Sequence, residues 1–266
     1  PRLVGWEHLL PAAVLEPDQN ATAPLIRWLY RACDDLLLPS QQAKELFATQ
    51  FAGKSAPNLH VVPPAIAAPQ DSALTATEAA SLARLKAPII ASVGQFDRTH
   101  DFKLVMRAFQ YFSRTNEGTL LLIGEGAGRA ALDSAATGFG LGNRMVVMEA
   151  RDRAAALLSK ADLYVSALQP SAFDHAMIHA LRHGLPIVAS DAPGGAPRAI
   201  LADGRYGKLA PDGDARVLAQ IIRDVIAAPK TTEFQQSQAA TFSAAHAADA
   251  FLAAISGEPA REQAAA

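Results

Sequence analysis

The sequence predicts an α/β fold in which parallel β-sheets are built from alternating strands and helices. Short apolar runs of strand type alternate with segments whose apolar residues recur every three or four positions, and this alternation is typical of βαβ units. Half of the 266 residues are apolar and 19% are charged, so the chain is able to bury a core. Its length suits one large domain or two ordinary ones.

Residues 1–68 contain an incomplete set of such elements. A complete doubly wound domain has about six strands, so about half of this one is expected to be missing. Trp6 and Trp28 are expected to fill its core. Strands are predicted at Leu3–Trp6, Leu36–Leu38 and Leu59–Val62, with helices at Pro24–Ala32 and from the N-cap Ser40 to about Phe51.

Prolines at positions 63, 64 and 69 mark a boundary, and residues 69–86 are expected to be a linker. A fuller alternation occupies residues 87–228. Residues 229–266 are expected to hold a polar linker, a last helix at Phe242–Ile255 and a frayed tail. The second part has predicted strands at Pro88–Val93, Thr119–Ile123, Met145–Met148, Asp162–Ser166, Leu185–Ala189 and Gly207–Leu209. Its predicted helices start near Phe102, Arg129, Asp152 and Ala215.

Charge and cysteine content exclude several classes of protein. The net charge is −2 and no basic block occurs, so nucleic acid and anionic membranes are not favoured partners. The single cysteine, Cys33, cannot form an internal disulfide, which fits a reducing compartment. No apolar run reaches the ~18 residues of a membrane helix. We expect a cytoplasmic protein, with peripheral association at the inner membrane face left open. Since the chain begins at Pro1, we expect a fragment or a processed chain.

Residues 165–200 carry the most informative motif. They read VSALQPSAFDHAMIHALRHGLPIVASDAPGGAPRAI, a strand, a loop, a short helix and a strand that ends in a Gly-Gly turn. This stretch resembles the donor-sugar motif of the retaining, GT-B-fold glycosyltransferases of family four ("group 1"). Their motif has Glu-Gly-Phe, five residues, Glu-Ala-Leu, Gly-x-Pro and a Gly-Gly turn. Ser171 and His179 occupy the two Glu positions. The positions that fit are Phe173, Ala180, Leu181, Gly184, Pro186, Asp191 and Gly195.

Other segments resemble the same family in the same order, which is more specific than one short motif. The resemblance implies a GT-B type fold with two Rossmann-like domains. Residues 1–68 would be part of the N-terminal, acceptor-side domain, and residues 87–228 would hold a nucleotide-diphosphate sugar of UDP, GDP or ADP type. Residues 229–266 would include a crossing helix. The matching segments are Leu59–Ile66, VGQFDRTHDF (93–102), LLIGEGAGRAAL (121–132) and DGRYGKLAPDGD (203–214).

The resemblance implies hexose transfer, in which a diphosphate leaves and its negative charge must be stabilised. Family members use an Arg and a Lys in the loop after the first strand of the donor domain, where this chain has Gln95 and His100. Gln95 donates a hydrogen bond without charge, and His100 offers charge only as an imidazolium. Backbone amides near His175 and Ala176, at a helix N-terminus, suit an anion whatever the side chains.

The two replaced carboxylates leave no residue that we name as catalytic. Ser171 accepts one weak hydrogen bond, and His179 accepts only through an unprotonated nitrogen. We expect neither a cofactor nor a metal. The donor-binding residues that the resemblance implies are Gly94, Gln95, His100, Gly124, Gly126, Ser171, Phe173, Asp174, His175, Ala176 and His179.

The sequence disfavours two other kinds of site. The turn at Gly124, Gly126 and Gly128 is similar to a dinucleotide loop, but Arg129 follows where that loop has its third glycine. His175, His179 and His183 have the spacing of one helical face, yet only Asp174 accompanies them as a potential metal ligand.

Three functions stay open at this point. The first is an active hexosyltransferase with an altered donor pocket, acting on a glycan, lipid or protein. The second is a catalytically degenerate GT-B module that acts as a partner subunit or binds a glycan or nucleotide, because four polar anchors are replaced together. The third is a related enzyme such as a sugar-nucleotide epimerase, with His100, His175 or His179 as its base. A protein partner would complete the N-terminal domain, unless that domain is dispensable.

Overall fold

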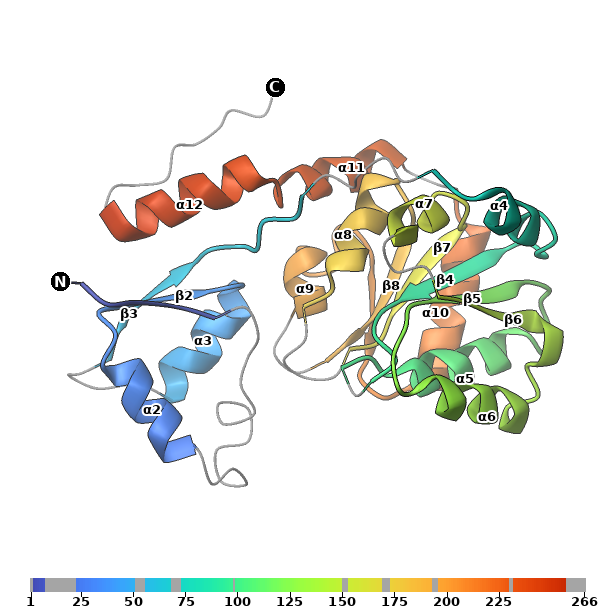
Figure 1. Ribbon diagram of the computed structural model, residues 1–266, viewed down its shortest axis with the longest axis horizontal. Coiled ribbons are helices and arrows are strands. Elements are labelled where there is room, and N and C mark those ends of the chain that lie inside the picture. The colour runs from blue at the N-terminus through green and yellow to red at the C-terminus, as the bar shows by residue number, and fades with distance from the viewer. Residues whose placement is uncertain are drawn as a thin grey trace.

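The computed structural model describes residues 2–7, 23–50, 56–67, 73–97, 99–149, 153–168, 173–192, 196–229 and 232–256. Within these residues the chain forms two parallel sheets, one of three strands and one of six (Figure 1). The strand orders are β1-β2-β3 and β6-β5-β4-β7-β8-β9. The predicted α/β class is therefore confirmed.

The three-stranded sheet comes from the N-terminal part of the chain. Its central strand is buried along its whole length, and Ser40 Oγ accepts a 3.1 Å hydrogen bond from the Ala43 N–H at the start of the second helix, as expected for an N-cap. The elements are β1 (Val4–Trp6), α2 (Ala23–Arg31), β2 (Asp35–Leu38), α3 (Gln41–Gln50) and β3 (Asn58–Val61).

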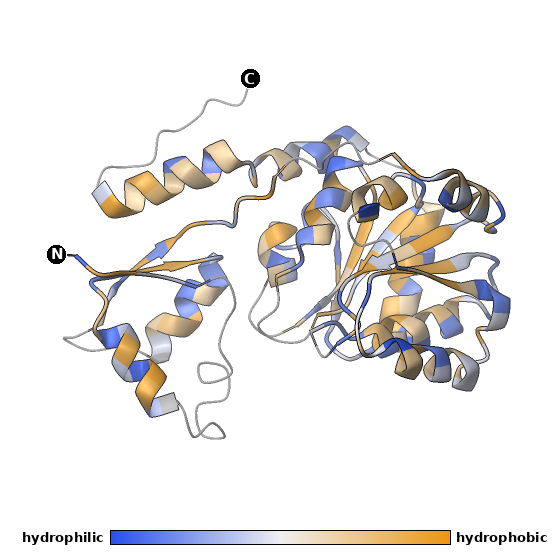
Figure 2. Ribbon diagram, viewed as in Figure 1, coloured by the Kyte–Doolittle hydropathy of each residue, from blue (hydrophilic) through white to orange (hydrophobic). Residues whose placement is uncertain are grey.

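The six-stranded sheet has helices on both faces, and its central strands are the most apolar part of the molecule (Figure 2). Helices α5, α6 and α10 cover one face, whereas α7, α8 and α9 cover the other. The strands are β4 (Ile89–Val93), β5 (Thr119–Ile123), β6 (Met145–Met148), β7 (Leu163–Ser166), β8 (Ile187–Asp191) and β9 (Lys208–Pro211). The helices are α5 (Phe102–Phe112), α6 (Arg129–Gly138), α7 (Ala154–Leu158), α8 (His175–Arg182), α9 (Ala196–Ile200) and α10 (Ala215–Ala227).

Two helices near the C-terminus connect the halves. Helix α11 (Thr232–Ala240) packs on α8, and α12 (Ala244–Ser256) lies over β2 and β3, where Phe251 stacks on Trp6 with ring centroids 5.4 Å apart (Figure 1). The prediction of a polar linker after Pro229 is wrong at α11. Gln235 and Gln238 are buried, and Gln238 Nε2 donates a 2.8 Å hydrogen bond to the Ile200 carbonyl, so polar side chains pack this helix against its neighbours.

The segment predicted as a linker, residues 69–86, contains helix α4 (Ala76–Leu82). A capping box starts this helix: the Glu78 N–H donates to Thr75 Oγ1, and the Thr75 N–H donates to a Glu78 carboxylate oxygen. Glu78 also accepts a 2.9 Å hydrogen bond from Arg153 Nε. The helix was missed because its seven residues are too few to show an apolar period.

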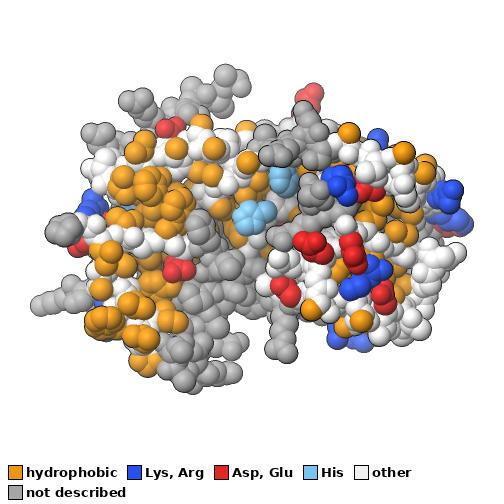
Figure 3. Space-filling view, in the orientation of Figure 1, with side chains coloured by type: hydrophobic (Ala, Val, Ile, Leu, Met, Phe, Trp, Pro, Cys, Tyr) orange, Lys and Arg blue, Asp and Glu red, His pale blue; other side chains and the backbone are white. Residues whose placement is uncertain are grey.

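The prediction that Trp6 and Trp28 fill a core is wrong. Their exposed fractions are 42% and 65%. On α2, Leu25 and Leu29 are also exposed, by 59% and 50%, so they face away from the sheet, whereas Ile26 and Tyr30 of the same helix pack on the core. Figure 3 shows apolar side chains crowded over the N-terminal half. The core there is instead built from Tyr30, Leu36, Leu38, Ala43 and Phe47.

In the part of the chain that the structure describes, no helix combines the length and the apolar character needed to cross a lipid bilayer.

Candidate functional site

The candidate site lies along the edge of the six-stranded sheet that is formed by the carboxyl ends of its strands. Since all six strands are parallel, the residues that follow β4, β5, β7 and β8 meet at this edge. The structure thereby brings together the loop after β4, which holds Gly94, Gln95 and His100, the turn after β5, which holds Gly124 and Gly126, and the start of α8. Ser171 lies outside the described residues.

The backbone of the glycine turn after β5 packs against the backbone of the loop after β4. The Phe96 N–H donates a 2.8 Å hydrogen bond to the Glu125 carbonyl, and the Gly128 N–H donates a 2.7 Å bond to the Phe96 carbonyl. A Cβ on Gly124 would lie 1.8 Å from the Gly94 carbonyl oxygen, and one on Gly126 would lie 2.9 Å from the Phe96 carbonyl oxygen. These glycines are therefore required by an approach of the protein's own backbone.

His100 is held in one orientation by its neighbours. Its ring covers Gly94, where an added Cβ would come within 2.5 Å of the imidazole, and it stacks on Phe102 with centroids 5.6 Å apart. Thr99 Oγ1 lies 3.0 Å from its Nδ1. The next residue joins this loop to β7, because the Asp101 N–H donates a 2.8 Å hydrogen bond to the Ala167 carbonyl. His100 thus stands at the carboxyl ends of the strands, packed between Gly94 and Phe102.

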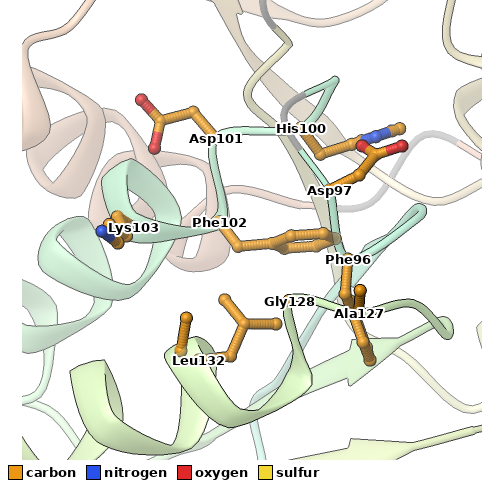
Figure 4. Close-up of a pocket in the computed structure, with 10 residues that line it drawn as sticks. Phe96, Asp97, His100, Asp101, Phe102, Lys103, Ala127, Gly128 and Leu132 are labelled. Atoms are coloured by element: carbon orange, nitrogen blue, oxygen red, sulfur yellow. The ribbon is translucent and has the colours of Figure 1, made fainter.

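A cavity of about 690 Å³ opens beside His100. Figure 4 shows the Phe102 ring lying between the loop that carries Asp97 and His100 and the helix that carries Leu132. The cavity is lined by Phe96, Asp97, His100, Asp101, Phe102, Lys103, Ala127, Gly128, Ala131 and Leu132. Gln95 is exposed in the same loop.

Asp174 is buried, although the sequence predicts it to bind the donor. Its carboxylate is only 1% exposed and caps α8, since Oδ1 accepts a 3.0 Å hydrogen bond from the Met177 N–H. Tyr164 and Ser166 on β7 donate to Oδ2 at 2.9 and 2.5 Å. Because these bonds use the carboxylate inside the protein, Asp174 positions the helix rather than reaching the edge. Sequence reasoning missed Tyr164 and Ser166, whose alternation with apolar residues along β7 shows only that their side chains share one face.

The side of α8 that is not buried carries His175, Ala176 and His179. His175 is exposed at the first turn and contacts the ring of Phe173 edge-on at 5.5 Å. Burial lowers the pKa of His179, and the cationic forms of Arg182, His183 and His175 lower it further, so His179 is neutral at pH 7. Among the described residues its Nδ1 has no hydrogen-bond partner. Figure 3 shows histidine side chains on the surface between the halves.

Two arginines near this edge are paired with acidic side chains. Arg198 on α9 contacts Asp191 at the end of β8 and lies 3.4 Å from Asp203. Arg129 at the start of α6 donates to Asp133 at 3.1 Å and to Glu149 at 2.7 Å. Because carboxylates of the protein already balance the charge of each arginine, each would attract a phosphate less strongly than an unpaired arginine would.

Comparisons with known proteins agree with this geometry. The family described as "Glycosyl transferases group 1" matches residues 87–228, which hold the whole six-stranded sheet. A curated relative, the lipopolysaccharide core biosynthesis glycosyltransferase LpsE of Rhizobium meliloti, is 26% identical over 141 residues, 53% of this chain and 40% of that protein. The chain thus spans less than half the length of this relative.

Solved structures share the fold at low sequence identity. The Anabaena HepE structure in complex with UDP and glucose has a TM-score of 0.76 at 17% identity, over 96% of this chain and 72% of that one. Sucrose-phosphate synthase from Thermosynechococcus elongatus has a TM-score of 0.71 at 22% identity, over 92% of this chain and 65% of that one. Because the family match covers more than half of the chain, the protein belongs to the group 1 glycosyltransferases.

Proposed function

We propose that this chain binds a nucleotide-diphosphate sugar at the edge where the strands of the six-stranded sheet end, and transfers the hexose to a glycan, lipid or protein with retention of configuration. The observation that carries the proposal is the start of α8. Its first turn is fixed to β7 through Asp174 and presents its N–H groups at this edge beside the loop of His100. A leaving diphosphate is stabilised by such fixed dipoles.

His100 is the proposed side-chain contact to the diphosphate. It occupies the position of the family's lysine, and its packing on Gly94 and Phe102 keeps the imidazole at the sheet edge. As an imidazolium it would donate a charge-assisted hydrogen bond to a phosphate oxygen. The neutral His179 would accept one hydrogen bond from a ribose hydroxyl through Nε2, because its unpartnered Nδ1 is buried, in place of the two that a carboxylate accepts.

Calorimetric titration with UDP, GDP and ADP at pH 6 and pH 7.5 tests the binding step. We expect one of these nucleotides to bind more tightly at pH 6, and His100→Ala to weaken that binding about 10- to 100-fold, the effect of one charge-assisted hydrogen bond. His246→Ala, on the exposed side of α12, is the matched control and should bind as the wild type does. The absence of binding for all three nucleotides would refute the proposal.

A transfer assay with the nucleotide sugars separates an active enzyme from a degenerate module. Turnover that is lost in His100→Ala but kept in His246→Ala supports catalysis. Tight nucleotide binding without hydrolysis or transfer would instead favour a non-catalytic subunit, which is the alternative that the replaced carboxylates at positions 171 and 179 suggest.

We also propose that a protein partner covers the N-terminal half at the edge strand β1 and at the outer side of α2. β1 lies at the edge of the three-stranded sheet, and the exposed apolar side chains of Leu25, Trp28 and Leu29 lie on the adjoining helix. Soluble surfaces rarely keep such a patch uncovered. In the Trp6→Phe background, Trp28 is the sole tryptophan, so its fluorescence should shift to the blue in the complex and not in the isolated chain.

Cytoplasmic location, with peripheral association at the inner membrane face, stays a prediction that cell fractionation tests.

A further inference from the structure

Helix α8 touches the candidate site with one end and the junction between the two halves with the other. Its N-terminal end is fixed to β7 by Asp174, as described above. At its C-terminal end the guanidinium of Arg182 donates hydrogen bonds to two consecutive carbonyls of the connection between the halves, Ile66 at 2.7 Å and Ala67 at 2.6 Å. The eight residues of α8 span only about 12 Å, so both ends belong to one rigid rod.

The second connection between the halves meets the first at the same place. The Ile66 N–H donates a 3.0 Å hydrogen bond to the carbonyl of Phe242, which lies between α11 and α12. The Arg182 carbonyl in turn accepts a 3.1 Å bond from Gln236 of α11. The Phe242 ring lies 6.3 Å from that of Phe173, the residue before the helix cap. Both connections are thus held against the helix that starts at the candidate site.

On the far side of this junction, β3 and α12 both pack within the N-terminal half. Val62 lies in a cluster with Leu37 and Ala254, and Arg2 donates a 2.7 Å hydrogen bond to the Ile255 carbonyl, so α12 moves with the three-stranded sheet. Among the described residues, the chain passes between the halves at residues 63–67 and 241–243 (Figure 1), and α3 also contacts α9. A change in the angle between the halves therefore requires the backbone of these two segments to bend. Arg182 is hydrogen-bonded to the first of them.

We propose that Arg182 is a positioning residue that sets the angle between the two halves and couples it to ligand binding at the start of α8. The coupling rests on the proposed function, whereas the control of the angle does not. Without the two hydrogen bonds the connection at residues 66–67 loses its attachment to α8, and the halves sample a wider range of orientations. The N-terminal half then less often has the orientation, relative to the candidate site of the six-stranded sheet, that transfer requires.

Spin labels on Glu45→Cys in α3 and Glu117→Cys before β5, in the Cys33→Ser background, report the distance between the halves, because both glutamates are exposed. We expect Arg182→Ala to broaden the distance distribution and Arg182→Lys to give an intermediate width. Arg205→Ala is the matched control, since the Arg205 guanidinium lies over the rings of Tyr206 and Phe234. An unchanged distribution in Arg182→Ala, even with a lower melting temperature, would overturn the proposal.

Addition of UDP separates this inference from the proposed function. UDP should narrow the distribution of the labelled parent and not that of Arg182→Ala. Because coupling between the angle and ligand binding acts in both directions, Arg182→Ala should then also weaken UDP binding, whereas Arg205→Ala should not. In a transfer assay Arg182→Ala should lower both kcat and kcat/KM for the donor. If UDP does not bind the parent chain, the proposed function fails, but a broader distribution in Arg182→Ala still supports control of the angle. Equal narrowing in both proteins would refute the coupling.

Discussion

Asp35 is a fully buried carboxylate with three partners. Its oxygens accept hydrogen bonds from Arg2, with Nη2 to Oδ1 at 2.6 Å, and from Asn58 at 3.3 Å, and His60 Nε2 lies 2.9 Å from Oδ1. The hydrogen bonds from Arg2 are the largest cause that lowers the pKa of Asp35 to about 2. These contacts join the first residues of the chain to β2 and β3.

The lowered pKa of Asp35 predicts how stability depends on pH. The unfolded carboxyl titrates near 4, above the folded value, so the stabilisation is complete above about pH 4 and is lost as the pH falls towards 2. It amounts to about 2 kcal/mol. Urea unfolding between pH 2 and 6 should show a shallower acid limb for Asp35→Asn than for the wild type. Asp224→Asn, an exposed carboxylate on α10, is the control, and an equal change in both variants would contradict the assignment.

At the scale of elements, the loop after β4 and the turn after β5 depend on glycine for their contact. Gly124 has a φ of +156° and faces the Gly94 carbonyl oxygen at a distance that excludes a Cβ. Gly138, at the end of α6, has nothing within 4 Å of where its Cβ would lie. The two glycines therefore predict opposite outcomes for the same substitution.

Gly124→Ala should lower the free energy of unfolding by at least about 3 kcal/mol, since the loop after β4 must move away. Gly138→Ala should raise it by about 0.5–1 kcal/mol, because alanine loses less backbone entropy in a helix. Chemical denaturation measures both. Hydrogen exchange at the Phe96 and Gly128 amides checks the cause, and unchanged protection of these amides in Gly124→Ala would argue against it.

At the scale of the whole molecule, the two halves have cores of unequal size. The sheet of six strands is sandwiched between two large apolar clusters, whereas the three-stranded sheet rests on a small cluster around Phe47 and a second around Leu37. Because the larger core buries far more apolar area, the N-terminal half should unfold at a lower temperature.

Differential scanning calorimetry at pH 7 should therefore show two transitions. Asp35→Asn should lower the first transition alone, and Gly124→Ala should lower the second alone, since each residue lies in a different half. A single transition that both substitutions shift equally would mean that α11, α12 and Arg182 join the halves into one cooperative unit.

Much of the fold was predictable because strands buried in a parallel sheet are visible in the sequence as short continuous apolar runs. The strands β4 and β5 are continuous apolar runs, and the structure places them at Ile89–Val93 and Thr119–Ile123, as predicted apart from Pro88. The loops of His100 and Gly124 were assigned to one site on the family resemblance, and the parallel topology brings them to one edge. The polar helix α11 was missed because its buried contacts come from residues distant in the sequence, and α4 was missed because its seven residues are too few to show an apolar period.

The sequence by itself predicted the strands of both sheets in order and the family resemblance of residues 87–228, and through that resemblance it predicted that Gln95, His100, Ser171 and His179 stand where the family has charged residues. Only the tertiary structure decided that Asp174 is a buried cap, that Trp28 is exposed, that the glycine turn receives the loop of Phe96, and that Arg182 grips the connection between the halves. The physical reason is that local patterns record which residues can be buried or bonded. Which neighbour buries or bonds them is fixed by the packing of segments that lie far apart along the chain.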